Sequence, residues 1–227
     1  MRKITLSLAV LAALAFALAG SANATIVFTD ENLFKAALQP GYYLEDFPGD
    51  GWYPMGYTAD FVDPVNGWSY RASESRGVLW HVPAGGGALS TQNSADCLTI
   101  TFPETGKPVT AVGGQFFGTD YDGNRVPAEI TILLSDGTTE MFNSSTGYDF
   151  RGFTYTTVQS LSVRIPASAG NPLNSANDPG PYTTLDHFYV GELAGAEAPI
   201  IPEPLTMLGM VFGLGGVGAY IRRRRTA

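Results

Sequence analysis

The chain has 227 residues and a formal net charge of −8 at pH 7. Between residues 25 and 201, seven basic residues stand against twenty acidic ones, a formal charge of −13, and a surface of that sign argues against nucleic acid as a partner. The single cysteine, Cys97, excludes an intramolecular disulfide, so stability must come from an apolar core, with or without help from a metal ion.

The N-terminus has the pattern of an export signal. Arg2 and Lys3 precede an apolar run over residues 4–19, and the small residues at 22–24 fit a cleavage site. We therefore predict a secretory signal peptide over residues 1–24. The part that follows is long enough for one domain with its own core, which we place at residues 25–192.

The first predicted element of this domain is a short helix over residues 31–38. Thr29 or Asp30 can act as its N-cap, and Pro40 ends it. The next stretch, residues 48–87, is rich in Gly, Pro, Trp and Tyr and only weakly periodic, so we expect either long loops or irregular strands there.

The rest of the domain is dominated by strand signals. Short segments rich in β-branched and aromatic residues, separated by turn formers, predict strands at 97–102, 109–117, 128–134, 138–142, 150–155, 160–165 and 185–190. Asp136-Gly137 predicts a hairpin turn, because this pair readily adopts positive φ. One short helix with many strands, and no internal repeat, predicts an all-β antiparallel β-sandwich.

Two groups of oxygen ligands are candidate calcium sites. Asp120, Asp122 and Asn124 place side-chain oxygens at i, i+2 and i+4 around Gly123, as calcium loops do, although the full EF-hand spacing is absent. The same residues are common in ordinary turns, so a turn without metal is the alternative.

The second group depends on the fold. If an early and a late strand of the sandwich lie side by side, Glu45, Asp46 and Asp186 come together, and their mutual repulsion requires either calcium or a compensating arginine. This pattern, with an acidic residue before Phe47 and Asp186 after a leucine, resembles jelly-roll domains of the lectin and carbohydrate-binding type. The resemblance implies a jelly-roll-like sandwich with a structural calcium ion between those strands.

Aromatic residues in the irregular segment form the candidate glycan-binding group. Rings on exposed loops stack on the C–H faces of pyranoses, while nearby polar groups bind hydroxyls. The alternative is that the rings fill the core beneath long loops. The residues are Trp52, Tyr53, Tyr57, Trp68, Tyr70 and Trp80.

Catalytic motifs are not apparent. The domain has two histidines, His81 and His187, far apart in sequence, and it lacks a nucleophile elbow, a zinc-protease helix and a phosphate-binding loop. We therefore predict a non-enzymatic protein. A glycoside hydrolase or lyase needs only two suitably spaced carboxylates, and with so many acidic residues that alternative stays open.

The C-terminal tail has three parts in a fixed order. It begins with a short motif and ends with a basic cluster, and these residues are Pro202, Glu203, Pro204, Arg222, Arg223, Arg224 and Arg225. A helix over the apolar residues 205–221 would be about 25 Å long. That length is marginal for a transmembrane helix, with the arginines on the cytoplasmic side. Residues 193–201 are predicted to be the linker.

Together these parts closely resemble the PEP-CTERM sorting signal of bacterial surface proteins, over residues 202–227. The resemblance implies an exosortase as partner, and it makes the Pro-Glu-Pro motif a processing substrate. The sequence thus predicts a protein exported across the inner membrane, transiently anchored by its tail, and placed at the cell surface or in the extracellular matrix. We expect the domain to bind extracellular polysaccharide, with a ligand-free structural protein as a further alternative.

Overall fold

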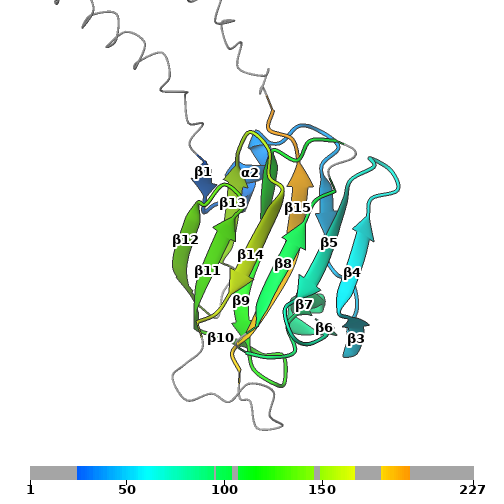
Figure 1. The fold of residues 1–227 in the computed structure, drawn as a ribbon, viewed down its shortest axis with the longest axis vertical. Coiled ribbons are helices and arrows are strands. Elements are labelled where there is room, and N and C mark those ends of the chain that lie inside the picture. Colours follow the sequence, from blue (N-terminus) through cyan, green and yellow to red (C-terminus); the bar gives the residue numbers. More distant parts are fainter. Residues whose placement is uncertain (1–24, 95, 104–106, 146–148, 167–179, 195–227) are drawn as a thin grey trace, which may run out of the picture. The chain divides into compact units, whose positions relative to one another are not determined.

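A computed structural model of the protein describes residues 25–94, 96–103, 107–145, 149–166 and 180–194. The predicted signal peptide, transmembrane helix and sorting motif lie outside the described residues. Within the described part of the chain, no helix has the length and hydropathy needed to cross a membrane. These residues fold into two antiparallel sheets stacked as a sandwich, which confirms the predicted all-β class (Figure 1).

The larger sheet has nine strands, and all of its described pairings are antiparallel. In spatial order, its main path is β1 (Ile26–Phe28), β13 (Phe150–Thr154), β9 (Ala111–Thr119), β15 (Tyr182–Gly191), β7 (Ala88–Ser90), β6 (Leu79–Val82) and β3 (Tyr53–Gly56). Off this path, β10 (Arg125–Val126) pairs with β9, and β2 (Tyr43–Glu45) pairs with β15. The strand β3 is therefore an edge strand of this sheet.

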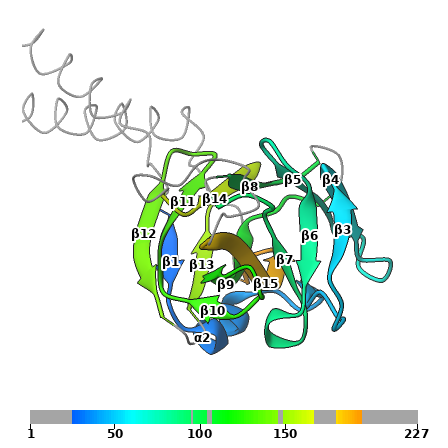
Figure 2. The same ribbon diagram turned by 90° about the horizontal axis from the view of Figure 1, so that it is seen from below.

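The smaller sheet has six strands and forms the second layer. Its order is β12 (Thr139–Ser144), β11 (Ala128–Leu134), β14 (Ser160–Arg164), β8 (Cys97–Thr101), β5 (Ser69–Glu74) and β4 (Thr58–Val62). Seen from below, the two sheets are stacked, and the helix α2 (Glu31–Ala37) lies on the outer side of the nine-stranded sheet (Figure 2).

The main core lies between the two sheets. Neighbouring residues of a strand point to opposite faces, so Val112 and Val190 enter this core while Ala111 and Tyr189 face outward. The outward residues are covered by Phe34 of α2, which is fully buried. Strands β9 and β15 are thus buried on both faces, which explains why they contain so few charged residues.

The predicted elements agree with the structure in existence and type. Asp30 caps α2 by accepting a hydrogen bond from the Leu33 backbone N–H at 2.9 Å. The Asp136-Gly137 turn joins β11 to β12, with Gly137 at φ +88°. The stretch 48–87 contains the irregular strands β3 to β6, which supports the second of its two interpretations. Leu193 still pairs with Leu38, so the domain extends slightly into the predicted linker.

Candidate functional site

The six predicted glycan-binding rings differ widely in solvent exposure. Trp52 is 46% exposed, Tyr53 44% and Tyr57 70%, whereas Trp80 is half-buried. Trp68 and Tyr70 are only 4% and 2% exposed. The sequence-based group is therefore not one surface.

Trp68 and Tyr70 belong to the core between the sheets. The Trp68 indole N–H donates a hydrogen bond to the Gly41 carbonyl at 2.7 Å. The Tyr70 ring stacks on Phe61 with a centroid distance of 4.7 Å and meets Phe188 edge-on at 5.0 Å. A sugar cannot reach either ring, so we remove both residues from the candidate binding group.

Tyr53 lies flat on a buried histidine. The Tyr53 and His81 rings are stacked with a centroid distance of 4.4 Å and an angle of 4°. His81 is itself 1% exposed, and its two ring nitrogens lie 2.7 Å from the Gly51 carbonyl oxygen and 2.9 Å from that of Phe47. A neutral imidazole can donate to one of these oxygens and an imidazolium to both. His81 therefore fixes the segment that leads into Trp52 and Tyr53.

Trp52 is supported by a different part of the chain. Its indole Cζ2 lies 2.9 Å from the position that a Cβ on Gly123 would occupy, so the ring packs on the backbone of the turn between β9 and β10. Gly123 has φ +79°, a conformation that favours glycine. The turn also carries Tyr121, which is 73% exposed. We call Trp52 and Tyr53 the aromatic platform.

The same turn is the first predicted calcium site. Asp120 Oδ1 accepts hydrogen bonds from the backbone N–H groups of Asp122 at 3.0 Å and Asn124 at 2.8 Å, and Oδ2 accepts one from the Asn124 side chain at 3.1 Å. The turn is thus closed by its own donors, as in the alternative interpretation. Calcium binding here remains a prediction.

A glycine-rich turn at residues 84–87 contacts the segment that leads into the aromatic platform. The Gly49 N–H donates to the Gly86 carbonyl at 3.2 Å, and the Cβ position of Gly87 would lie 1.8 Å from the Phe47 carbonyl oxygen. Gly85 faces Asp186 across the same turn, with its Cβ position 3.3 Å from Asp186 Oδ2. No larger residue fits at Gly87. The strands β3, β6, β7 and β10, which surround this turn, lie toward one end of the sandwich (Figure 1).

Asp186 is a buried carboxylate with basic partners. It is 1% exposed, and its Oδ2 lies 3.6 Å from the Arg125 guanidinium and 3.2 Å from His187 Nδ1. Burial raises the pKa of Asp186, and the charges of His187 and Arg125 oppose that rise. A β-bulge between Asp186 and Tyr189 puts His187 at φ +45°, a strained conformation for a residue with a side chain.

The strands that carry the second predicted calcium group are neighbours in the sheet, but its carboxylates have separate partners. Glu45 pairs with Phe188, so the early and late strands do lie side by side. However, Glu45 accepts hydrogen bonds from the Tyr43 hydroxyl and the Phe47 N–H, Asp46 is exposed, and Asp186 lies beside Arg125. Arg125 is a basic partner of Asp186, and calcium binding by this second group remains a prediction.

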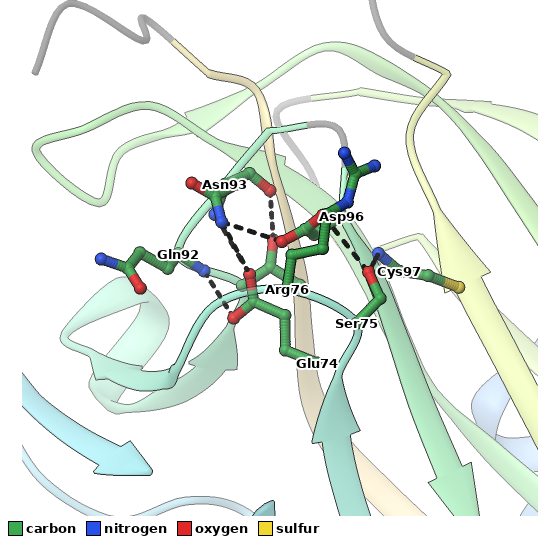
Figure 3. Close-up of polar contacts among 8 residues, drawn as sticks. Glu74, Ser75, Arg76, Gln92, Asn93, Asp96 and Cys97 are labelled. Atoms are coloured by element: carbon green, nitrogen blue, oxygen red, sulfur yellow. Dashed lines mark hydrogen bonds and ion pairs between the residues drawn. The ribbon is translucent and has the colours of Figure 1, made fainter. Parts of the chain in front are cut away.

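A buried carboxylate pair that the sequence did not single out lies where two chain crossovers link the sheets (Figure 3). Glu74 ends β5, Asp96 precedes β8, and the Asn93 side-chain amide lies 3.4 Å from Glu74 Oε1 and 2.8 Å from Asp96 Oδ2. Arg76 binds Asp96 at 3.0 Å. Burial, with added hydrogen bonding and charge from Asp96, raises the pKa of Glu74 to about 8, although backbone N–H groups of Gln92 and Asn93 oppose the rise.

This pair does not have the form of a glycosidase site. The two carboxyl groups of such enzymes flank the sugar from roughly 5 to 9.5 Å apart. Here a single amide bridges the two groups, Glu74 is 8% exposed, and Asp96 is fully buried. A sugar ring has no room between them. Among the residues that the structure describes, no three His, Cys, Asp or Glu side chains form a group that could hold a metal ion.

Three features of this region were missed by the sequence interpretation. His81 was interpreted only as structural, because nothing in the sequence pairs it with Tyr53 across two strands. Tyr121 could have been added to the ring group, since an aromatic residue between two aspartates in a predicted turn is expected to be exposed. Glu74 and Asp96 meet only through the crossovers, which no local pattern encodes.

Comparisons with known proteins leave the family open. No protein-family model and no curated protein matches the sequence. One matching solved structure is an exo-β-1,3-galactanase from Phanerochaete chrysosporium with galactose, 12% identical, with a TM-score of 0.28, covering 59% of this chain and 29% of that one. A second is a family two carbohydrate esterase from Cellvibrio japonicus, 12% identical, with a TM-score of 0.27, covering 75% and 35%.

A third matching structure is the solution structure of CtCBM11, 10% identical, with a TM-score of 0.24, covering 77% of this chain and 98% of that one. All three are carbohydrate-active or carbohydrate-binding proteins by name. This chain spans about a third of the length of the first two. We base no functional conclusion on likenesses at this level.

Proposed function

We propose that this protein is an exported bacterial surface or matrix protein whose domain binds polysaccharide through the aromatic platform, without catalysing a reaction. The observation that carries the proposal is the state of Trp52 and Tyr53, which are each nearly half exposed although each ring rests on a fixed neighbour. Rings that fill a core are buried, and exposed rings without a binding role do not need to be held by a packed neighbour.

The geometry suits stacking on a sugar. One face of Tyr53 is covered by His81, so its exposed area belongs to the other face and the ring edge. Because the ring is already fixed, little side-chain entropy remains to be lost when a pyranose stacks on it. Trp52 offers a second, larger aromatic surface next to it in sequence. Each of the two supported rings therefore offers one stacking surface for a sugar.

The competing functions are supported less well. A structural protein without a ligand would be expected to bury its tryptophans; Trp68 is buried, but Trp52 is 46% exposed. A glycoside hydrolase requires two separated carboxyl groups on an open face, and the pair Glu74 and Asp96 is buried and bridged by Asn93. Both observations favour a binding module.

The cellular address follows from the two ends of the sequence. The signal peptide predicted at 1–24 would export the chain, and the tail at 202–227 would engage the membrane and an exosortase. Polysaccharide binding at the surface fits this address, because an exported matrix protein meets glycans there. Calcium at Asp120, Asp122 and Asn124 would stabilise the turn beneath Trp52, and a rise in melting temperature on adding calcium would support it.

The test is a binding screen with single-residue variants. We would purify the full chain in a mild detergent and follow its retardation in gels that contain soluble neutral, acidic or basic polysaccharides. Trp52→Ala and Tyr53→Ala are each expected to weaken retention about 5- to 100-fold, since stacking of a nucleobase on one aromatic ring is worth about 1–3 kcal/mol and a sugar face stacks in a similar way. Tyr57→Ala is the control, because Tyr57 is the more exposed ring, lies outside the aromatic platform, and should change retention little.

Retention that survives both platform variants would overturn the proposed site. Retention that falls equally in Tyr57→Ala would show that any exposed ring contributes. Melting curves of all three variants would confirm that loss of binding is not loss of folding.

A further inference from the structure

The charge around the aromatic platform bears on which glycans it accepts. The segment before it and the turn beneath it contain four aspartates, of which three are exposed. The residues are Asp46, Asp50, Asp120 and Asp122, and Asp120 is the half-buried one. The basic residue of this region is Arg125, whose side chain is 12% exposed and lies beside Asp186.

Two of these aspartates belong to the segments that carry and support the Trp52 ring. Asp50 is two residues before Trp52, which places their Cα atoms within about 7 Å. Asp122 adjoins Gly123, whose Cβ position is 2.9 Å from Trp52 Cζ2. At physiological ionic strength, the Debye length is about 8 Å. We therefore expect a charged group on a sugar that stacks on Trp52 to feel the charges of both aspartates.

The other basic side chains of the described residues are engaged elsewhere. Arg71, Arg76 and Arg151 form ion pairs with Asp60, Asp96 and Glu140, and Lys35 pairs with Glu31. Lys107 lies over the buried Trp68 ring, and Arg164 belongs to β14 of the other sheet. In the part of the chain that the structure describes, no basic side chain is thus placed to receive a carboxylate, sulfate or phosphate on the platform.

We propose that the aromatic platform selects glycans by charge, binding amino sugars with free ammonium groups best, neutral sugars less well and polyuronates least. The inference rests on the proposed polysaccharide binding and adds its substrate class. Stacking supplies the affinity that all three classes share. Asp50 and Asp122 supply the discrimination, by attraction to an ammonium group and repulsion of a carboxylate.

The experiment uses three hexasaccharides with the same β-1,4 linkage: a glucosamine hexamer, a cellohexaose and a hexamer of glucuronic acid. Affinities for the full chain in detergent would be measured by calorimetry in low and in high salt. At low salt we expect about tenfold between successive ligands in the order glucosamine, glucose, glucuronate. High salt should bring the three affinities together, because it screens the exposed carboxylates.

Two variants separate the platform from the general acidity of the domain. The double variant Asp50→Asn with Asp122→Asn should retain cellohexaose and lose most of the preference for glucosamine. Trp52→Ala should weaken all three ligands. Binding of the glucosamine hexamer that survives Trp52→Ala would reflect attraction to the acidic surface as a whole and would overturn the inference.

The remaining outcomes distinguish the two proposals. Glucuronate bound as tightly as cellohexaose, with both lost in Trp52→Ala, would overturn charge selection and leave the polysaccharide site intact. No binding of any of the three hexamers, together with no retention in the gel screen, would overturn the polysaccharide site and the selectivity with it.

Discussion

Two pairs of aromatic residues from one irregular segment end in opposite environments. Trp52 and Tyr53 are nearly half exposed, whereas Trp68 and Tyr70 are almost completely buried. Composition does not distinguish them, since each pair contains one tryptophan and one tyrosine. The difference lies in the strands that carry the tyrosines and follow the tryptophans, and in what those strands pack against.

Tyr70 lies on an interior strand and Tyr53 on an edge strand. The strand β5 pairs with β4 on one side and β8 on the other, and its inward residues face the nine-stranded sheet. The strand β3 pairs only with β6 in the described sheet, so its far side is open. Exposure of a ring is therefore decided by long-range strand order, and the platform exists because β3 lies at a sheet edge.

The largest effect should come from truncating a ring of each pair. Tyr70→Ala removes a core side chain that stacks on Phe61 and meets Phe188 edge-on, and it should cost about 3–5 kcal/mol of unfolding free energy. Tyr53→Ala removes one stacking contact at the surface and should cost about 1 kcal/mol. Chemical denaturation of both variants measures the two values. Similar costs would mean that the platform is part of the core and that the comparison is wrong.

A second prediction concerns Glu74, the last residue of β5, which is the strand that also contains Tyr70. Because the pKa of Glu74 in the folded state is about 8, above its ordinary value of 4.5, the folded protein binds this proton more tightly than the unfolded chain. Stability from this group is therefore full below pH 4.5 and is lost as the pH rises toward 8. Glu74→Gln imitates the protonated form, and it should make the protein more stable than wild type above pH 8, by up to about 5 kcal/mol, the free energy that corresponds to pKa values of 4.5 and 8.

Unfolding free energies from pH 5 to 9 would test this. The exposed Glu129→Gln is the control and should leave the pH dependence as in wild type. Glycan affinity should not change in Glu74→Gln, since Gln92 and Asn93, which bind the Glu74 carboxylate, lie outside the segments of the aromatic platform. A pH dependence that persists in Glu74→Gln would place its origin in another carboxylate.

The fold was largely predictable from local patterns. Strands such as β14, with Leu161 and Val163 alternating with serines, show one buried face directly in the sequence. The helix α2 was predictable from its cap at Asp30. By contrast, the pattern of β5 was overlooked, although Tyr70, Ala72 and Glu74 alternate with polar residues and all face inward. That alternation would have placed Tyr70 in the core.

The candidate site was predictable only in part. Trp52 and Tyr53 could be proposed because aromatic residues beside glycines in a weakly periodic segment are often exposed. Their supports could not, because His81 and Gly123 reach them from β6 and from the turn after β9. Strand pairing between segments so distant in sequence depends on the whole sandwich, and no spacing rule within the segment encodes it.

The smallest predicted effect comes from two glycine variants. Comparing them distinguishes the cost of backbone strain from the loss of support for Trp52. Gly123→Ala and Gly137→Ala both place a side chain at positive φ, with φ +79° and +88°, and each should cost about 1–2 kcal/mol. Only the Cβ at Gly123 meets Trp52, whereas the one at Gly137 meets open space. Gly123→Ala should therefore also weaken glycan retention severalfold and shift tryptophan fluorescence, while Gly137→Ala should change neither. If both variants bind glycan as wild type does, the turn does not position Trp52, and the ring is held by its own segment alone.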